Sequence, residues 1–226
     1  MLFLFDCDGV LVNSEIIASE VDAELLGEAG YPISAEDVTR RFAGLTFRMM
    51  VEIIESETGR TLPDDMLARQ KEKLDRRLAS EMKPVPGVED LLDRLDSERC
   101  VCSNSSSERL GITLGRAQLL DRFVPHIYSA VEVGDRQPKP APNVYAYAAK
   151  QFGRPPRECV VIEDSVFGVT AGRGAGMRVV GFTGGAHTWP GHADLLTEAG
   201  AETVIKRLAD LPKVAEAFAA WDGLAD

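Results

Sequence analysis

The chain has 226 residues, 45% of them hydrophobic, and carries a formal net charge of −11 at pH 7. This length allows one domain, or one domain with an insert, to bury a large core. The negative charge argues against nucleic acid and against an anionic membrane surface as partners, because both favour a basic protein face. An anionic substrate would therefore need a metal ion or a local basic residue to receive it.

The N-terminus and the cysteines bear on the cellular compartment. An apolar run of five residues precedes Asp6 without a basic start, so we expect neither a signal peptide nor a membrane span. The chain has four cysteines and no Cys-x-x-Cys pair, which disfavours disulfides and structural zinc. We predict a cytoplasmic protein and a monomer.

Short apolar runs alternate with longer amphipathic stretches along most of the chain, a pattern typical of the strands and helices of an α/β sheet. The expected strands are residues 2–5, 100–102, 127–129, 159–162, 178–182 and, more weakly, 203–205. The expected helices between and after them are residues 88–95, 106–120, 143–152, 165–174 and 208–221. We predict a doubly wound, Rossmann-like parallel sheet.

Residues 14–82 break this alternation, because they contain helical patterns and no convincing strand. The expected helices there are residues 15–29, 35–42, 47–58 and 63–82, and the last has a dense charged face typical of a solvent-exposed helix. We predict an all-helical cap domain of residues 14–82, inserted into an α/β core domain of residues 1–13 and 83–226. The sequence "KPVPG", residues 83–87, would be the hinge that returns the chain to the core.

Polar side chains follow several of the expected strands. Open parallel sheets bind ligands beyond the carboxyl ends of their strands, so these residues should converge at one edge. They are Asp6, Asp8, Ser103, Asn104, Glu163 and Asp164, together with Lys139 in the proline-rich loop 137–142.

The carboxylates of this group predict a metal site. Asp6, Asp8, Glu163 and Asp164 would repel one another unless they held a divalent cation. Ligands that are all oxygen favour Mg²⁺, which also accepts a substrate phosphate oxygen. Lys139 would add a second positive charge, and Ser103 would add a hydroxyl donor. Asp6 can then attack phosphorus in line, and Asp8 can protonate the leaving alcohol and later activate water.

Four segments carry a family resemblance. "FDCDGVLVNSE", "VCSNSS", "QPKPAP" and "VVIEDSVFGVTAGRGAGM" resemble the four ordered motifs of the haloacid dehalogenase superfamily. The similarity is to the β-phosphoglucomutase-like subgroup, which has a helical cap inserted after the first motif. The resemblance implies that Asp6 is the nucleophile. It also implies that Asp8 is the acid/base and binds the metal through its main-chain carbonyl.

The same resemblance implies roles for the other motif residues, and some keep an alternative. Ser103, helped by Asn104, would bind the phosphoryl oxygens, although both residue types also cap helices. Lys139 would stabilise the nucleophile and the phosphate. Asp164 and Glu163 would hold Mg²⁺, but Glu163 can instead pair with Lys139 or reach the metal through water.

Two further motifs are interpreted without a catalytic role. His187 and His192 lie in "HTWPGH" without acidic neighbours in the sequence, so we expect neither to be a metal ligand. The glycine-rich run at 171–176, "AGRGAG", ends a helix before a strand. A dinucleotide-binding loop instead joins a strand to a helix, so that function is disfavoured.

Three residue patterns narrow the activity within the superfamily. Asp8 favours phosphoryl transfer, because halide release needs no proton. Ala18 stands near the position where mutase-like enzymes carry a cap histidine, and no lysine precedes Lys71 to form a Schiff base in the cap. We predict a phosphatase that hydrolyses small sugar or sugar-acid phosphates through an aspartyl-phosphate. A phosphoglucomutase-like phosphoryl transferase and a non-catalytic phosphometabolite-binding protein remain the alternatives.

The cap should select the substrate. The segment "RRFAGLTFRMM", residues 40–50, is similar to the cap loop that faces the catalytic centre in related enzymes. Gly44, Thr46 and Arg48 are the expected substrate contacts, and Arg40 or Arg41 is a further candidate for a second anionic group. Asn13 replaces the aspartate more common before "SE", near the hinge. Within the subgroup, the chain is similar to bacterial phosphatases that act on 6-phosphogluconate.

Overall fold

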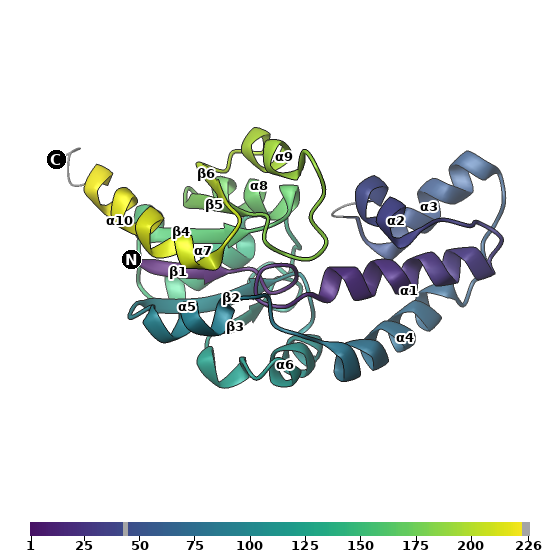
Figure 1. Cartoon of the computed structure of the whole chain (residues 1–226), viewed down its shortest axis with the longest axis horizontal. Coiled ribbons are helices and arrows are strands. Elements are labelled where there is room, and N and C mark those ends of the chain that lie inside the picture. Colours follow the sequence, from purple (N-terminus) through teal and green to yellow (C-terminus); the bar gives the residue numbers. More distant parts are fainter. Residues whose placement is uncertain (43–44, 223–226) are drawn as a thin grey trace.

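A computed structural model describes residues 1–42 and 45–222 of the chain (Figure 1). Its centre is a six-stranded parallel sheet with the strand order β3-β2-β1-β4-β5-β6. The strands are β1 (Leu2–Phe5), β2 (Glu98–Ser103), β3 (Ile127–Ser129), β4 (Cys159–Glu163), β5 (Arg178–Phe182) and β6 (Thr203–Ile205). The predicted parallel sheet is confirmed, and β1 lies between β2 and β4.

Helices cover both faces of this sheet, so the doubly wound arrangement is also confirmed. The helices are α5 (Val88–Arg94), α6 (Ser107–Arg116), α7 (Asn143–Gln151), α8 (Val166–Gly174), α9 (His192–Glu198) and α10 (Leu211–Asp222). Alternate residues of β1 belong to different hydrophobic clusters: Phe3 and Phe5 lie in one, and Leu2 and Leu4 lie in the other. This alternation follows from the two-residue period of a strand and requires apolar cover on each face.

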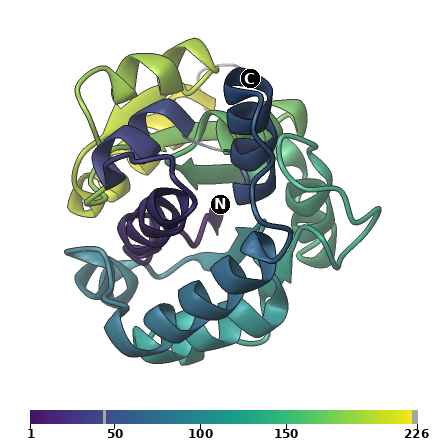
Figure 2. The same cartoon turned by 90° about the vertical axis from the view of Figure 1, so that its right-hand side faces the viewer.

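An all-helical stretch lies between β1 and α5 and extends to the right in Figure 1. It comprises α1 (Ser14–Glu28), α2 (Ala35–Phe42), α3 (Phe47–Thr58) and α4 (Met66–Glu81). Figure 2 shows α1 in the middle of this stretch, with α4 on one side and α2 and α3 on the other. Buried Leu25, Ile54 and Leu78 join these helices, whereas the charged side chains of α4 form ion pairs at the surface.

Two short connections join the helical stretch to the sheet, and they lie side by side. The Asn13 backbone N–H donates to the Lys83 carbonyl at 3.0 Å, and the Val85 N–H donates to the Leu11 carbonyl at 2.9 Å. The segment "KPVPG" thus runs beside residues 11–13, which places both crossings at one point. Within the described residues, no helix is long and apolar enough to cross a membrane.

The structure differs from the expected elements in a few places. The helix expected at 106–120 ends at Arg116, because Gln118 adopts a positive φ of 59°, and a 3-10 turn at Leu120–Arg122 follows. The helix expected to begin at residue 63 begins at Met66. Helix α9 was not expected, because its seven residues bury only His192 and Leu196 and so show no clear apolar period.

Candidate active site

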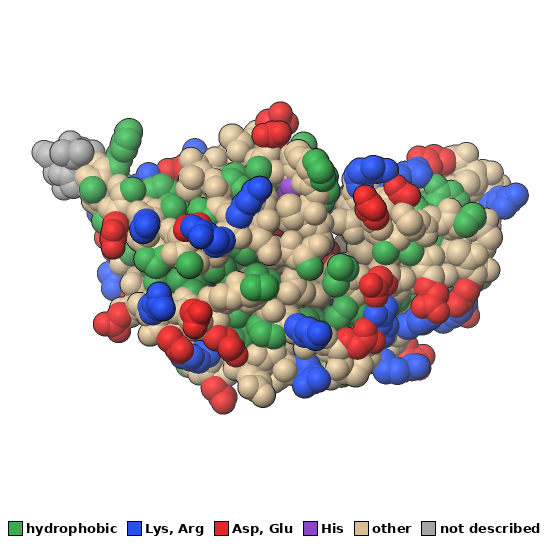
Figure 3. All heavy atoms as spheres, in the orientation of Figure 1, with side chains coloured by type: hydrophobic (Ala, Val, Ile, Leu, Met, Phe, Trp, Pro, Cys, Tyr) green, Lys and Arg blue, Asp and Glu red, His purple; other side chains and the backbone are tan. Residues whose placement is uncertain are grey.

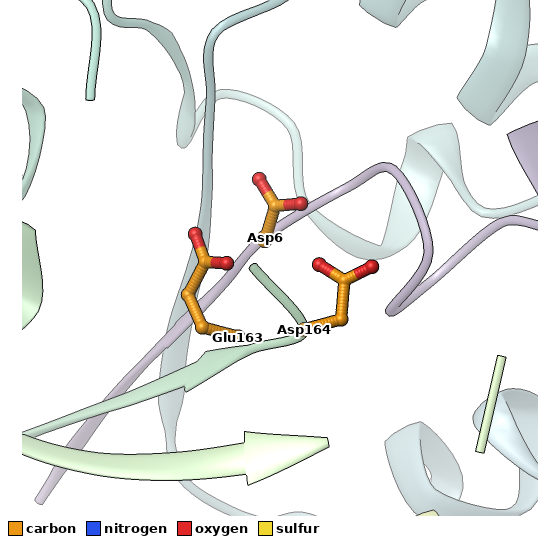
Figure 4. Close-up of side chains that lie close together, drawn as sticks. All are labelled: Asp6, Glu163 and Asp164. Carbon is orange, nitrogen blue, oxygen red and sulfur yellow. The ribbon is translucent and has the colours of Figure 1, made fainter. Parts of the chain in front are cut away.

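The candidate site lies where the carboxyl ends of β1, β2 and β4 meet. Asp6 directly follows β1, and its N–H donates to the carbonyl of Ile162 on β4 at 3.0 Å. Glu163 ends β4 and Asp164 follows it, so the strand register brings the three carboxylates together (Figure 4). One oxygen from each of Asp6, Glu163 and Asp164 lies within 4.8 Å of the other two. All three residues are buried.

Lys139 is the buried cation of this group. Its Nζ donates to Asp6 Oδ1 and Glu163 Oε1, both at 2.6 Å, and to the main-chain carbonyl of Cys102 at 2.7 Å. Burial on its own lowers the pKa of Lys139, but the charges of Asp6 and Glu163 outweigh it and hold that pKa above its usual value. Lys139 is therefore an ammonium ion in the core of the site.

One ammonium does not balance the negative charge. Burial, aided by the charges of Glu163, Asp164 and Asp8, raises the pKa of Asp6 well above its usual value, against the opposing charge of Lys139. Glu15, on the first turn of α1, adds to this excess, because burial and the charges of Asp8 and Asp164 raise its pKa to about 7. A buried, all-oxygen donor set with surplus negative charge fits Mg²⁺.

Glu163 is fully enclosed by donors. Its Oε1 accepts from Lys139 Nζ at 2.6 Å and from the Tyr145 hydroxyl at 2.7 Å. Its Oε2 accepts from Ser165 through the backbone N–H at 3.2 Å and the hydroxyl at 3.0 Å. Gly168 leaves room for this carboxylate, since a Cβ there would lie 1.8 Å from Oε1. The contacts therefore show the pairing with Lys139 that the sequence left open as an alternative.

Asp8 lies beside the triad with its carboxylate held by three hydroxyls. Ser14 donates to Oδ1 at 2.5 Å, while Ser105 and Ser103 donate to Oδ2 at 2.8 and 3.3 Å. Gly9 makes the turn after it, with φ of 80°. A Cβ on Gly9 would lie 1.8 Å from Asp164 Oδ2, so this position needs glycine for space as well as for conformation.

Ser103 and Asn104 do not cap a helix. The N-cap residue of α6 is Ser106, whose hydroxyl accepts from the Arg109 N–H, so neither Ser103 nor Asn104 caps this helix. The Asn104 side chain instead holds the loop that carries Lys139. Its Oδ1 accepts from the Lys139 N–H at 2.7 Å, and its Nδ2 donates to the Lys139 carbonyl at 3.4 Å.

Two of the three expected cap contacts, Thr46 and Arg48, lie within the described residues. Gly44 lies outside the described residues. Thr46 caps α3 by accepting from the Met49 N–H, and Arg48 is exposed on the same helix. In the described part of the chain, neither makes a hydrogen bond to the carboxylate cluster. Figure 3 shows the surface hollowed between the helical stretch and the part of the molecule that holds the sheet.

Two other arginines of the helical stretch already have partners. Arg40 pairs with Asp37 at 2.5 Å on the same helix. Arg41 pairs with Glu57 and donates to the Tyr31 hydroxyl. By contrast, no hydrogen bond or ion pair is found for Arg48 among the described residues.

His187 has the acidic partner that its sequence neighbours do not provide. Its Nε2 lies 2.9 Å from Asp164 Oδ2, and His192 Nε2 lies 2.7 Å from the main-chain carbonyl of the same aspartate. Sequence reasoning missed these contacts because Asp164 belongs to another loop. It also missed Ser14, Ser105 and Tyr145, whose residue types carry no signal without the fold.

The chain is similar to known proteins in sequence and in structure. A family model described as haloacid dehalogenase-like hydrolase matches residues 1–176. An Escherichia coli K12 protein named 6-phosphogluconate phosphatase is 30% identical over 187 residues, or 82% of this chain and 84% of that protein.

Two solved structures are close in sequence as well as in fold. A haloacid dehalogenase-like protein of unknown function from Agrobacterium tumefaciens C58 has a TM-score of 0.92 and 51% identity, covering 96% of this chain and 98% of that one. A hydrolase of the same family from Deinococcus radiodurans R1, solved with bound phosphate and sodium, has a TM-score of 0.81 and 32% identity. That comparison covers 96% of this chain and 95% of the other.

Proposed function

The chain belongs to the haloacid dehalogenase-like hydrolases, and on that premise we propose that it is a Mg²⁺-dependent phosphatase of sugar or sugar-acid phosphates. The observation that carries the proposal is the buried Asp6 carboxylate, bound by Lys139 at 2.6 Å and flanked by Asp164. Surplus carboxylate charge beside one fixed ammonium is an arrangement suited to a divalent cation and a phosphate together.

Asp6, Asp164 and the main-chain carbonyl of Asp8 would hold the metal. When bound, Mg²⁺ would neutralise the carboxylates and polarise the phosphate. The four hydrogen bonds of Glu163 to protein donors favour a role in holding Lys139 over direct metal contact. Glu163 would then act on the site through the position of the ammonium.

The chain's own side chains supply the nucleophile and the acid/base. The bond from Lys139 occupies Oδ1 of Asp6 and leaves Oδ2 to attack phosphorus, which forms an aspartyl-phosphate. Asp8 would protonate the departing alcohol oxygen and then accept a proton from the water that cleaves the intermediate. Ser14, Ser103 and Ser105 hold its carboxylate in place by their hydroxyls.

Ser103 and Asn104 would serve the phosphoryl group in different ways. Ser103 is buried at the end of β2, and its hydroxyl, which lies 3.3 Å from Asp8 Oδ2, would turn to donate to a phosphoryl oxygen when substrate binds. Asn104 would act mainly by holding the Lys139 loop, because both ends of its amide bind that residue's backbone. Lys139 would then meet developing negative charge on the phosphoryl oxygens.

We propose residues 14–82 as a cap domain that closes over this site and selects the substrate. The side-by-side connections at residues 11–13 and 83–85 support a hinge there. Arg48 is the strongest candidate to bind a second anionic group, since Arg40 and Arg41 are paired within the cap. A sugar acid phosphate would supply such a group, in line with the named activity of the Escherichia coli relative.

The four buried free cysteines support a cytoplasmic location.

The first experiment is phosphate release from a panel of neutral and acidic sugar phosphates, with Mg²⁺ and with EDTA. We expect turnover that needs the metal and disappears in Asp6→Asn. Folded protein that releases no phosphate from any member would contradict hydrolysis. Transfer of the phosphoryl group to an added sugar would then favour the transferase, and binding without turnover would favour a non-catalytic protein.

A further inference from the structure

The segment of residues 183–192, which runs from the end of β5 to the first residue of α9, packs against Asp164. His187 and His192 both reach this aspartate, one at the side chain and the other at the backbone. The two imidazole rings meet edge to face, with centroids 5.8 Å apart, and Trp189 stacks on His192 at 4.1 Å. The loop therefore holds Asp164 through a packed set of rings.

Residues from other elements keep His187 in this place. The rest of the loop is tied to the hinge, because the Ala186 N–H donates to Asn13 Oδ1 at 3.0 Å. A Cβ on either Gly9 or Gly185 would lie 2.8 Å from His187 Cε1, so two glycines make the space that the ring fills. The His187 side chain is only 7% exposed. Its position is thus fixed by packing on several sides.

The partner atoms define which ring nitrogen carries hydrogen. Main-chain carbonyl oxygens only accept hydrogen bonds, and so does an ionised carboxylate. Both histidines must therefore donate from Nε2. Both Nδ1 atoms are buried and have no hydrogen-bond partner in the described part of the chain. His187 consequently offers one directed donor, and that donor points at Asp164.

Asp164 depends on this bond more than the other carboxylates depend on theirs. Asp6 is bound by Lys139, and Glu163 is bound by three different side chains. Among the described residues, His187 is the side chain that donates to the Asp164 carboxylate. The bond occupies Oδ2, and Figure 4 shows the Asp164 carboxylate beside that of Asp6 in the cluster.

We infer that His187 is a positioning residue that holds the Asp164 carboxylate in the orientation needed to bind the divalent cation. This inference rests on the proposed metal site. A partner that orients a metal ligand contributes about 10- to 100-fold to metal affinity. His187 would give Asp164 a fixed direction without contacting the metal itself, and the loop 183–192 would provide the support.

The test is Mn²⁺ affinity, measured without substrate by the electron paramagnetic resonance signal of the free ion. His187→Leu removes the donor and keeps bulk, and we expect it to weaken Mn²⁺ binding at least about 10-fold. His187→Gln offers an amide N–H at a similar reach and should recover most of the affinity. Thr188→Val is the matched loop control, because the buried Thr188 hydroxyl has no partner in the described structure.

Asp164→Asn separates the inference from the function on which it rests. If Asp164→Asn binds Mn²⁺ like the wild type, the proposed metal site is wrong. If Asp164→Asn loses the ion while His187→Leu stays within about 2-fold of the wild type, the metal site stands and the role of His187 is overturned. Unfolding of each variant, measured in EDTA so that no metal is bound, shows whether it is folded. If His187→Leu does not fold, the Mn²⁺ affinities of His187→Ala and His187→Gln are compared instead, and the same difference of at least about 10-fold is expected between them.

Discussion

Lys139 Nζ lies 2.6 Å from Asp6 Oδ1, so the expected nucleophile is in contact with a buried ammonium before any substrate arrives. The same ammonium binds Glu163, which has no exposed surface. Lys139 thus lies at the centre of a charge network, in which its ammonium group compensates the buried carboxylates of Asp6 and Glu163. Removing one charge from such a network leaves its partners buried and unpaired.

Lys139→Met should therefore reduce both activity and stability. We expect kcat to fall by about 100- to 1,000-fold because stabilisation of the phosphoryl oxygens is lost. The free energy of unfolding should fall by about 3–5 kcal/mol, since the carboxylates of Asp6 and Glu163 lose their cation. Urea denaturation measures the second effect. Adding Glu163→Gln to this variant should restore part of the stability and none of the activity, and recovery of activity would contradict the assigned role.

Gly9→Ala tests how closely the turn approaches Asp164. Any non-glycine residue at a φ of 80° costs about 1–2 kcal/mol, and here the new Cβ also collides with Asp164 Oδ2. Gly30→Ala is the matched control, because Gly30 has a φ of 83° and open space around it. We expect both variants to lose stability in urea and only Gly9→Ala to lose Mn²⁺ affinity. Equal metal binding in the two variants would contradict the close approach.

Asp22 should make stability depend on pH. It is buried in α1, with Gln70 Nε2 donating to Oδ1 at 2.9 Å, and burial raises its pKa to about 7. In the unfolded chain the carboxyl ionises near pH 4, so between about pH 4 and 7 the folded state binds the extra proton. Stability is therefore lost as the pH rises through this range.

Asp22→Asn should remove this dependence. Because the pKa of Asp22 rises by about three units, the free energy of unfolding of the variant should exceed that of the wild type by on the order of 4 kcal/mol at pH 8, and the gap should close toward pH 4. Urea denaturation from pH 4 to 8 measures the difference. Glu24→Gln, exposed on the same helix, should run parallel to the wild type. A gap that stays constant with pH would show that Asp22 is ionised in the folded protein.

Arg48→Ala tests substrate selection by the cap. We expect KM to rise roughly 10-fold for acidic sugar phosphates, because a charged hydrogen bond is lost, with little change for neutral ones. Arg40→Ala, which breaks only the pair with Asp37, should change KM neither for acidic nor for neutral sugar phosphates. The Arg48 assignment fails if KM for every acidic substrate is unchanged in the Arg48→Ala variant.

Residues at the ends of strands, and Lys139 in its proline-rich motif, could be predicted from the sequence, whereas Tyr145 and His187 could not. Asp6 and Asp164 follow apolar runs whose register places them together once the sheet is parallel. Tyr145 and His187 contact the same cluster from α7 and from the loop before α9, and nothing in their local sequence indicates this. The sequence shows no acidic residue next to the two histidines, because Asp164 comes near them only in the folded chain.

The helical stretch shows the same division. The bounds of α2 and α3 match the expected helices, since their apolar spacing is regular and Thr46 caps the second. Which arginine is unpaired depends on side chains from other helices, such as Glu57 against Arg41. The proposed role of Arg48 therefore rests on the structure, in which Arg40 and Arg41 are paired with Asp37 and Glu57.

The central claim is that Asp6 becomes phosphorylated and that Asp8 is needed to complete hydrolysis. The most direct measurement is acid quenching of Asp8→Asn after reaction with ³²P-labelled p-nitrophenyl phosphate, whose leaving group departs without help from an acid. We predict labelled protein with the phosphoryl group on the peptide that contains Asp6, and no label when Asp6→Asn is added. Release of p-nitrophenol and free phosphate in equal amounts, with no labelled protein at any time, would contradict the account.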